Sequence, residues 1–323
     1  MKKNRTIILS RIRSRAKTLF PEAWAEKFRE ARDGVQTAQN HFLLQRELAD
    51  RSVWRDLGSA CRVLFCRRRT ILFFPERPPY RFAAYDACTF LGYRIVKRPH
   101  RKFDVAFKRS NATFFDDALL GAVPVEFARI INRESLDISK KTVGRVFGKV
   151  FGYELTVDPA LYTGAMIEKS DVNGAHDGVI VQGPLPSAQI RDDRVYQKLV
   201  ENRSFIDGYF LDYRVPIHGG VIPLVYLKHR PETQRFTVYE HTDFKKPEEV
   251  FGLDELDKIC RLAAEMGLDY GEMDVLRDRD GRIYVVDVNN TPRNHTASLP
   301  VGRKRDSVEC MAKTFQQLVE QYA

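Results

Sequence analysis

Two acidic residues and one amide near the end of the sequence have the spacing of a metal-binding hairpin. Asp274 lies in one alternating apolar run, and Asp287 and Asn289 lie in a second. The dipeptide Asp280-Gly281 between the runs is a strong signal for a tight turn. If it forms the loop, counting outward along both strands places Asp274 directly opposite Asp287.

Alternation along a strand predicts which neighbours share the face of these acids. Val285 should lie with Asp287 and Asn289, whereas Tyr284, Val286 and Val288 should point to the core. A one-residue bulge in the turn would break this register.

Facing carboxylates predict a divalent cation. At about 5 Å apart they destabilise a sheet unless positive charge lies between them. Carboxylate and amide oxygens suit Mg²⁺ or Mn²⁺, and Mg²⁺ usually completes its shell with phosphates and water. The hairpin therefore indicates a phosphate-bearing substrate. The alternative interpretation is a polar, exposed hairpin with coincidental acids.

A second candidate element delivers a lysine into a glycine-containing loop. Lys169 ends an apolar run, and Gly174 and Gly178 follow it. Backbone amides in such a loop can approach phosphate oxygens, and the ammonium group adds a point charge. Because many ordinary hairpins contain two glycine turns, the loop by itself favours a structural role.

The order of these elements resembles the ATP-grasp superfamily, and most closely the D-alanine:D-alanine ligase type. The resemblance covers about residues 132–300 and rests on Lys169 before the glycine loop, the run Tyr196-Gln197-Lys198-Leu199-Val200, and Asp274 with Asp287-x-Asn289. It implies binding of ATP with Mg²⁺ or Mn²⁺ between two lobes. Asp274, Asp287 and Asn289 would be the metal ligands.

The resemblance also implies a set of nucleotide contacts. Lys140 and Lys169 would be the two nucleotide lysines, and the mobile phosphate loop would contain both glycines. Gln197 would read the adenine amino group, and Asp212 would lie near the ribose. The full implied nucleotide set is Lys140, Lys169, Gly174, Gly178, Gln197, the backbone at Lys198 and Val200, and Asp212.

Lys228, with Arg230 nearby, resembles the basic residue that reaches the transferred phosphate. Two departures from the family pattern affect the chemistry. Asp287 stands where Glu is common, and Glu272 stands where many ligases carry an Arg that stabilises the tetrahedral intermediate. Arg214 or Arg293 would then have to supply that charge.

The implied activity is ATP-dependent formation of an amide bond from a carboxylate and an amine through an acyl phosphate. The carboxylate substrate would be a small molecule, a peptide or an acidic glycan. A kinase that phosphorylates a hydroxyl remains an alternative because of Glu272. A non-catalytic nucleotide-sensing or anion-binding protein is a further alternative.

These residues need a fold that brings distant segments together. The pattern predicts an α/β and α+β protein of the ATP-grasp fold, in which a small parallel α/β domain precedes two α+β lobes. We expect a basic helical segment over residues 1–69, the small domain over 70–135, and the ATP-grasp domain over 136–323, divided at residue 200. Within residues 1–69 the helical pattern covers about 21–64.

Strand patterns occur at residues 70–74, 93–96, 104–107, 164–168, 178–182, 195–200, 209–215 and 221–227. Helix patterns occur over 81–91, between 132 and 153 with Asp137 or Ser139 as N-cap, over 254–266, and after Asp306.

Composition sets the remaining expectations. The net charge of +10 favours anionic partners, although nucleic acid is not expected. Apolar runs are too short for a membrane span, and the N-terminal hydrophobic stretch is too short for a signal peptide. The five cysteines lack zinc-site spacing. We therefore expect a cytoplasmic protein without a transmembrane segment, and a homodimer is an open alternative.

Overall fold

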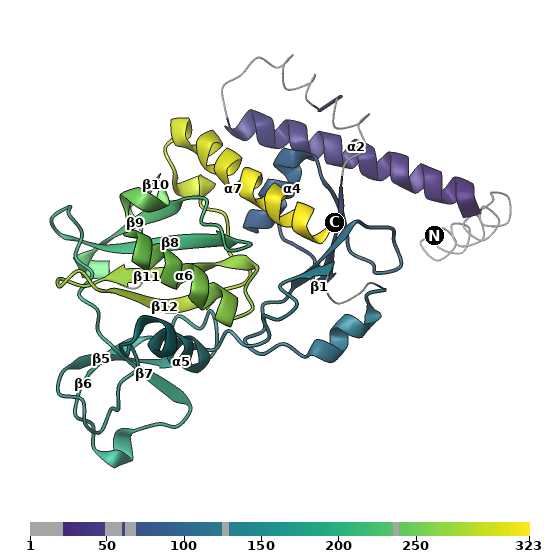
Figure 1. The fold of residues 1–323 in the computed structure, drawn as a ribbon. Coiled ribbons are helices and arrows are strands. Elements are labelled where there is room, and N and C mark those ends of the chain that lie inside the picture. Colours follow the sequence, from purple (N-terminus) through teal and green to yellow (C-terminus); the bar gives the residue numbers. More distant parts are fainter. Residues whose placement is uncertain (1–21, 49–59, 62–68, 125–128, 235–238) are drawn as a thin grey trace, which may run out of the picture.

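The computed structural model describes all residues except 1–21, 49–59, 62–68, 125–128 and 235–238. In the described residues the strands form one parallel and two antiparallel sheets (Figure 1). The predicted fold class, a small parallel α/β unit followed by α+β lobes with an additional N-terminal helix, is confirmed. The division into domains at the predicted boundaries stays a prediction.

The parallel sheet has the order β2-β1-β3-β4. Its strands are β1 (Thr70–Pro75), β2 (Arg94–Val96), β3 (Val105–Arg109) and β4 (Ile130–Ile131). Strand β1 is central, and Ile71, Leu72 and Phe73 are fully buried, because helices or loops cover both faces of a parallel sheet. The carboxyl ends of β1, β2 and β3 meet at one edge of this sheet.

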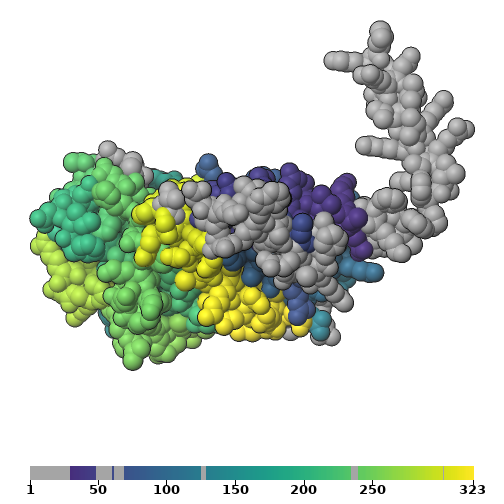
Figure 2. All heavy atoms as spheres, turned by 90° about the horizontal axis from the view of Figure 1, so that it is seen from above, coloured from purple at the N-terminus to yellow at the C-terminus, as the bar shows by residue number. Residues whose placement is uncertain are grey.

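Three helices pack beside this sheet. They are α2 (Glu22–Leu48), α4 (Ala83–Leu91) and α7 (Val301–Tyr322). Phe315 and Leu318 of α7 join Phe73 in one core, so the end of the chain returns to the parallel sheet. Figure 2 shows α7 (yellow) between the purple and blue N-terminal part and the green lobe.

Helices α4 and α7 begin at other residues than predicted, and α4 begins at Ala83 and not at residue 81. Helix α7 begins at Val301, earlier than predicted, because its polar first turn carries no apolar periodicity. Residues 49–59 and 62–64 of the predicted N-terminal helical pattern lie outside the described residues, as does the basic leader over residues 1–21.

The larger antiparallel sheet has the order β10-β9-β8-β11-β12. Its strands are β8 (Tyr209–His218), β9 (Val225–Pro231), β10 (His241–Lys245), β11 (Tyr270–Arg277) and β12 (Ile283–Asn289). The strand predicted over 221–227 is shifted to β9, because Gly219 and Gly220 have positive φ and Val221 bridges back to His218 in the turn. The shift places Lys228 within a strand.

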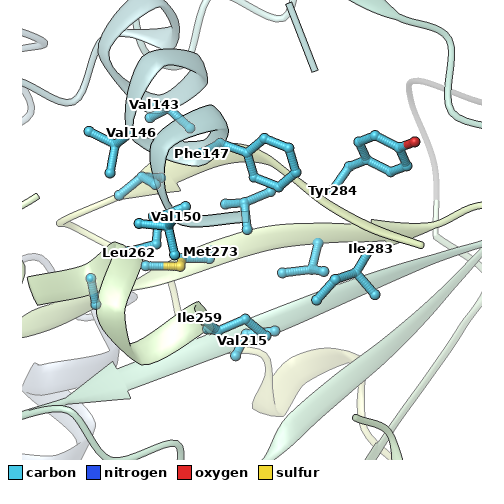
Figure 3. Close-up of a cluster of buried hydrophobic side chains, with 14 of the residues drawn as sticks. Val143, Val146, Phe147, Val150, Val215, Ile259, Leu262, Met273, Ile283 and Tyr284 are labelled. Atoms are coloured by element: carbon cyan, nitrogen blue, oxygen red, sulfur yellow. The ribbon is translucent and has the colours of Figure 1, made fainter. Parts of the chain in front are cut away.

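Helices α5 (Lys140–Phe151) and α6 (Leu253–Glu265) cover one face of this sheet. Ser139 caps α5, as predicted, by accepting a hydrogen bond from the Thr142 N–H. Figure 3 shows side chains of both helices meeting Val215 and Met273 from the sheet. With this face buried against helices, the opposite face is the one that carries charged side chains.

The third sheet, of order β6-β5-β7, consists of β5 (Ala165–Ser170), β6 (Val179–Gln182) and β7 (Arg194–Lys198). Short 3₁₀ helices occur at Asp117–Ala122, Ser187–Gln189, Glu232–Gln234, Pro247–Glu249 and Thr296–Ser298. Among the described residues, no helix is long and apolar enough to cross a lipid bilayer.

Candidate functional site

The two predicted acids face each other across the last hairpin. Strands β11 and β12 pair Asp274 with Asp287, as predicted, although nearer the turn the pairing differs by one residue from the predicted register. The turn itself is longer than predicted, because Asp278 and Arg282 close it by hydrogen bonds and Gly281 adopts φ +84°. A bulge beside Asp274 then shifts the pairing by one residue. The two deviations cancel, so the carboxylates still meet.

The same bulge makes one predicted orientation wrong. Val285 does not share the face of Asp287, because it is fully buried in the core with Met273, Val275 and Val288. The extra residue between Val285 and Asp287 interrupts the alternation on which the prediction relied.

Arg214 extends the row of charged residues across the sheet. It pairs with Asp274 in the strand ladder between β8 and β11, and its guanidinium forms an ion pair with the Asp274 carboxylate. Burial raises the pKa of Asp274 to about 7, Arg214 opposes the rise, and Asp287 adds to it. The site thus holds two close carboxylates with one guanidinium beside them.

The environment of Asp287 fits a cation. Its Oδ1 is buried and has no hydrogen-bond partner among the described residues. A buried, unpaired carboxylate oxygen is costly, so a bound cation would stabilise this arrangement. Two facing carboxylates match the one or two protein carboxylates that Mg²⁺ usually takes.

Asn289 fits the predicted ligand role less well. Its Oδ1 accepts hydrogen bonds from the Thr291 N–H at 2.8 Å and the Thr291 hydroxyl at 3.2 Å. The next side chain, Asn290, has a buried Oδ1 without a partner in the described structure. The described residues contain no group of three or more His, Cys, Asp or Glu side chains that could hold a metal.

Two predicted lysines approach these acids from other elements. The Lys169 ammonium on β5 donates to the Val286 carbonyl at 3.1 Å, and Lys140 at the start of α5 donates to the Val172 carbonyl at 2.8 Å. The pKa of Lys169 is lowered to about 8. Burial is the main cause and the nearby Lys140 contributes, whereas Asp287 acts in the opposite direction. The structure therefore brings both lysines near the acidic hairpin.

The glycine loop after β5 is anchored at several points. Gly174 has φ +72°, which favours glycine, whereas Gly178 has no such requirement. Asp177 accepts hydrogen bonds from the Ser170 N–H at 3.1 Å and its hydroxyl at 3.2 Å, and it forms an ion pair with Arg194. Such anchoring holds the loop over the end of β5.

The predicted adenine-reading segment contains one unsatisfied amide. Gln197 is buried, and its Nε2 has no partner in the described residues. The Lys198 N–H donates to the Leu155 carbonyl at 2.9 Å, and the Val200 carbonyl accepts from the Asn202 N–H at 3.0 Å. These two backbone groups are already bonded within the protein.

Asp212 and Lys228 face each other across β8 and β9. The Asp212 carboxylate accepts from the Arg230 Nε at 2.6 Å and from the Asn202 amide at 2.9 Å. The pKa of Lys228 is lowered to about 8, mainly by burial and also by the nearby Arg214. Lys228, Arg230 and Arg214 thus form a dense group of cations on the face of the sheet that α5 and α6 do not cover.

Tyr239 contacts these cations, although the sequence did not predict it as a site residue. Its hydroxyl accepts hydrogen bonds from Arg214 and Arg230, and the Lys228 ammonium lies 4.1 Å from its ring centre. No local pattern marks this tyrosine, because it follows the β9 strand in a connection whose path depends on the fold.

Glu272 forms a second buried pair on the same face. Its Oε2 lies 2.7 Å from Nε2 of His295, which was not among the predicted site residues. Burial raises the pKa of Glu272, but His295, Arg214 and Lys228 together lower it below its ordinary value. Burial lowers the pKa of His295, and the Glu272 carboxylate opposes this shift.

Arg293 is not joined to the charged row, although it lines a cavity together with Glu272 and His295. It is exposed, and it forms an isolated bridge with Phe82 beside the parallel sheet. No hydrogen bond or ion pair joins its side chain to Arg214, Lys228 or the acidic hairpin within the described residues. Arg214 is therefore the predicted arginine that lies in the site.

No family model and no curated protein matches the sequence. Solved ATP-grasp ligases match most of the chain in three dimensions. The ligase PsnB, complexed with minimal precursor, Mg and ADP, covers 75% of this chain and 96% of its own at 13% identity, with a TM-score of 0.48. The D-alanine–D-alanine ligase from Bacillus anthracis covers 79% and 97% at 14% identity and a TM-score of 0.48.

The macrocyclase MdnC from Microcystis aeruginosa, bound with its precursor peptide MdnA, covers 77% of this chain and 99% of its own. Its identity is 11% and its TM-score is 0.46. At TM-scores below 0.5 these similarities assign no residue and no activity to this chain, and the candidate site is defined by its own contacts. The chain resembles ATP-grasp ligases over about three quarters of its length.

Proposed function

We propose that the protein is an ATP-dependent ligase that joins a carboxylate to an amine. The observation that carries the proposal is the convergence of Arg214, Asp274 and Asp287 in one row of the sheet, with Lys169 approaching from a different sheet. A cluster of acids and lysines on facing elements matches a cation and a polyphosphate bound together.

Asp274 and Asp287 would hold Mg²⁺ or Mn²⁺. The unpaired Oδ1 of Asp287 supports this assignment, since a cation would satisfy it. Asn289 would also bind the ion only if its Oδ1 contacted the ion while keeping the hydrogen bonds from Thr291, or gave up those hydrogen bonds. When bound, the ion would neutralise charge that develops on the phosphate oxygens.

Lys140, Lys169 and Lys228 would contact the phosphates of ATP. Burial disfavours the charged form of Lys169 and Lys228, and an anion between them would restore it. Backbone amides of the loop containing Gly174 and Gly178 would add neutral donors.

The base and sugar of ATP would lie toward β7. The buried Gln197 amide supports an adenine contact, because an acceptor on the ligand would satisfy its unpaired N–H group. The Lys198 carbonyl and the Val200 backbone would complete the adenine edge. Asp212 would reach the ribose, since each of its oxygens keeps a lone pair beyond the bonds to Arg230 and Asn202.

The reaction would proceed in two steps. A substrate carboxylate oxygen attacks the γ-phosphorus, the bond to ADP breaks, and an acyl phosphate forms. An amine then attacks the acyl carbon, loses a proton, and phosphate leaves as the amide forms. Arg214 and Lys228 lie where they can stabilise charge on these oxygens. Arg293 would take part only if its exposed side chain turned toward the charged row.

One observation favours a second candidate, a kinase acting on a hydroxyl. Glu272 places a buried carboxylate where a ligase of this type commonly has an arginine, and its interaction with His295 keeps it ionised. Negative charge there opposes a tetrahedral oxyanion but is compatible with a hydroxyl acceptor.

An ADP-release screen tests both candidates. Purified protein with Mg-ATP would be offered amino acids, peptides and uronic acids in carboxylate and amine pairs, and products would be identified by mass spectrometry. The ligase proposal expects an amide product with ADP and phosphate in equal amounts. A phosphorylated product without amide would establish the kinase instead. Failure of calorimetry to detect Mg-ATP binding would reject both.

A further inference from the structure

The carboxyl edge of the parallel sheet carries a group of exposed cations. Arg77 follows β1, and Lys97 and Arg98 follow the neighbouring β2. Arg81 lies further along the loop after β1, and all four side chains are exposed. We call these four residues the basic rim. Burial lowers the pKa of Lys97, and the nearby Arg77 lowers it further, which places the ends of β1 and β2 close together.

Some exposed cations of the protein have acidic partners, as Lys149 has Glu265 and Arg191 has Asp193. Within the described structure, no carboxylate forms an ion pair with any residue of the rim. Glu76, which directly follows β1, is already bonded to Arg109. Such uncompensated charge attracts anions to this edge.

Backbone hydrogen bonds join the rim to the loop that follows the acidic hairpin. The Ala83 N–H donates to the Pro292 carbonyl at 3.0 Å, and the Asn294 N–H donates to the Arg81 carbonyl at 2.8 Å. This loop begins directly after Asn289. The rim therefore lies beside the candidate site and not on a remote face.

The loop after β1, which carries Arg77 and Arg81 of the rim, is preformed. The Phe82 N–H donates to the Pro79 carbonyl at 3.0 Å, and the Phe82 ring is buried against Phe107. Tyr80 is 69% exposed in the middle of the loop and packs edge-on against Tyr85. Arg and Tyr side chains on a rigid backbone are typical of binding surfaces, because little order is lost on contact.

We propose that the basic rim binds an acidic peptide, several of whose carboxylates pair with the rim while another is presented to the site for activation. The proposal rests on the proposed ligase function, which requires a carboxylate. Nucleic acid could pair with the rim but offers no carboxylate to activate. Glutamate carboxylates on flexible stems also suit long, exposed cationic side chains better than acids fixed on sugar rings.

Binding is tested on the full chain without ATP. A fluorescein-labelled hexaglutamate peptide would be titrated and followed by fluorescence anisotropy, with hexaglutamine as the neutral comparison. We expect binding of the glutamate peptide only, with affinity that falls as salt rises. The triple substitution Arg77→Gln, Lys97→Gln and Arg98→Gln should weaken binding about tenfold, since three exposed ion pairs are lost.

The matched control is the double substitution Lys258→Gln and Arg261→Gln on α6, which removes cations that already pair with Asp254 and Asp257. It should bind the peptide like the unaltered chain. Equal weakening in both variants, or tighter binding of a polyuronate or an oligonucleotide of similar charge than of the peptide, would overturn the proposal.

A kinetic measurement separates this proposal from the ligase function. With the acidic peptide as carboxylate substrate, the triple variant should raise its KM about tenfold while the Kd for ATP is unchanged. Peptide binding that depends on the rim, without ADP release, would refute the ligase function but support the rim as the peptide-binding surface. ADP release with an unchanged KM would refute the rim and retain the ligase.

Discussion

Arg214 and Asp274 occupy opposed positions on neighbouring strands, and their side chains form an ion pair within the candidate site. One carboxylate oxygen of Asp274 is therefore engaged by a cationic side chain. On the other side Asp287 lies opposite Asp274 and keeps an unpaired buried oxygen. The site thus pairs a guanidinium directly with Asp274 but leaves one oxygen of Asp287 without a hydrogen-bond partner among the described residues.

Asp287→Asn should stabilise the unliganded protein and weaken Mg-ATP binding. Repulsion from Asp274 is relieved, which is worth about 0.5–1 kcal/mol, while a cation loses a charged ligand. Calorimetry should show Mg-dependent ATP affinity reduced by at least about tenfold, and thermal unfolding should show a higher midpoint. Asp280→Asn, at the exposed tip of the same hairpin, is the control. Unchanged Mg dependence would remove Asp287 from the metal site.

Tyr239→Phe should lower kcat about tenfold with little change in the stability of the fold. The ring that contacts Lys228 is retained, but the hydroxyl that accepts from Arg214 and Arg230 is lost. A hydrogen bond to a charged group is worth about 1.5–3 kcal/mol, so the two guanidinium groups lose positioning. Tyr209→Phe, whose hydroxyl bonds to exposed Glu240, is the control for steady-state kinetics. Equal effects in both variants would assign Tyr239 no special role.

Gln197→Met should raise the unfolding free energy of the unliganded protein by about 1 kcal/mol and weaken ATP binding about tenfold. The substitution keeps the side-chain length and removes a buried N–H group that has no partner among the described residues. The unfolding free energy is measured by urea titration and ATP affinity by calorimetry. A variant that binds ATP normally would place the adenine ring elsewhere.

Asp86→Asn should stabilise the protein more at pH 8 than at pH 5. Burial raises the pKa of Asp86 from 3.8 to about 7, and the hydrogen bond from Asn294 only partly opposes the rise. The native state then binds more protons than the unfolded state between these values, so the unaltered protein loses stability as pH rises through this range. Asparagine removes the loss.

The expected gain from this substitution is on the order of 2 kcal/mol above pH 7 and declines toward zero near pH 4. Urea unfolding at several pH values measures it. A gain that is the same at pH 5 and pH 8 would contradict the raised pKa of Asp86.

The sequence by itself determined the two strands of the acidic hairpin. Alternating apolar residues on both sides of Asp280-Gly281 specify two strands, because a slip by one residue would turn the core side chains to solvent. The helix capped by Ser139 was equally readable, since a cap and an apolar stripe are local signals. Local periodicity was enough in both cases.

Only the tertiary structure decided which of these elements meet. The bulge that buries Val285 depends on packing beneath the sheet, and the positions of Tyr239 and His295 depend on how distant segments return to it. The separation of Arg293 from the charged row has the same origin. Segments far apart in sequence come into contact when they pack into the same hydrophobic core. A local pattern along the chain does not specify which segments pack together.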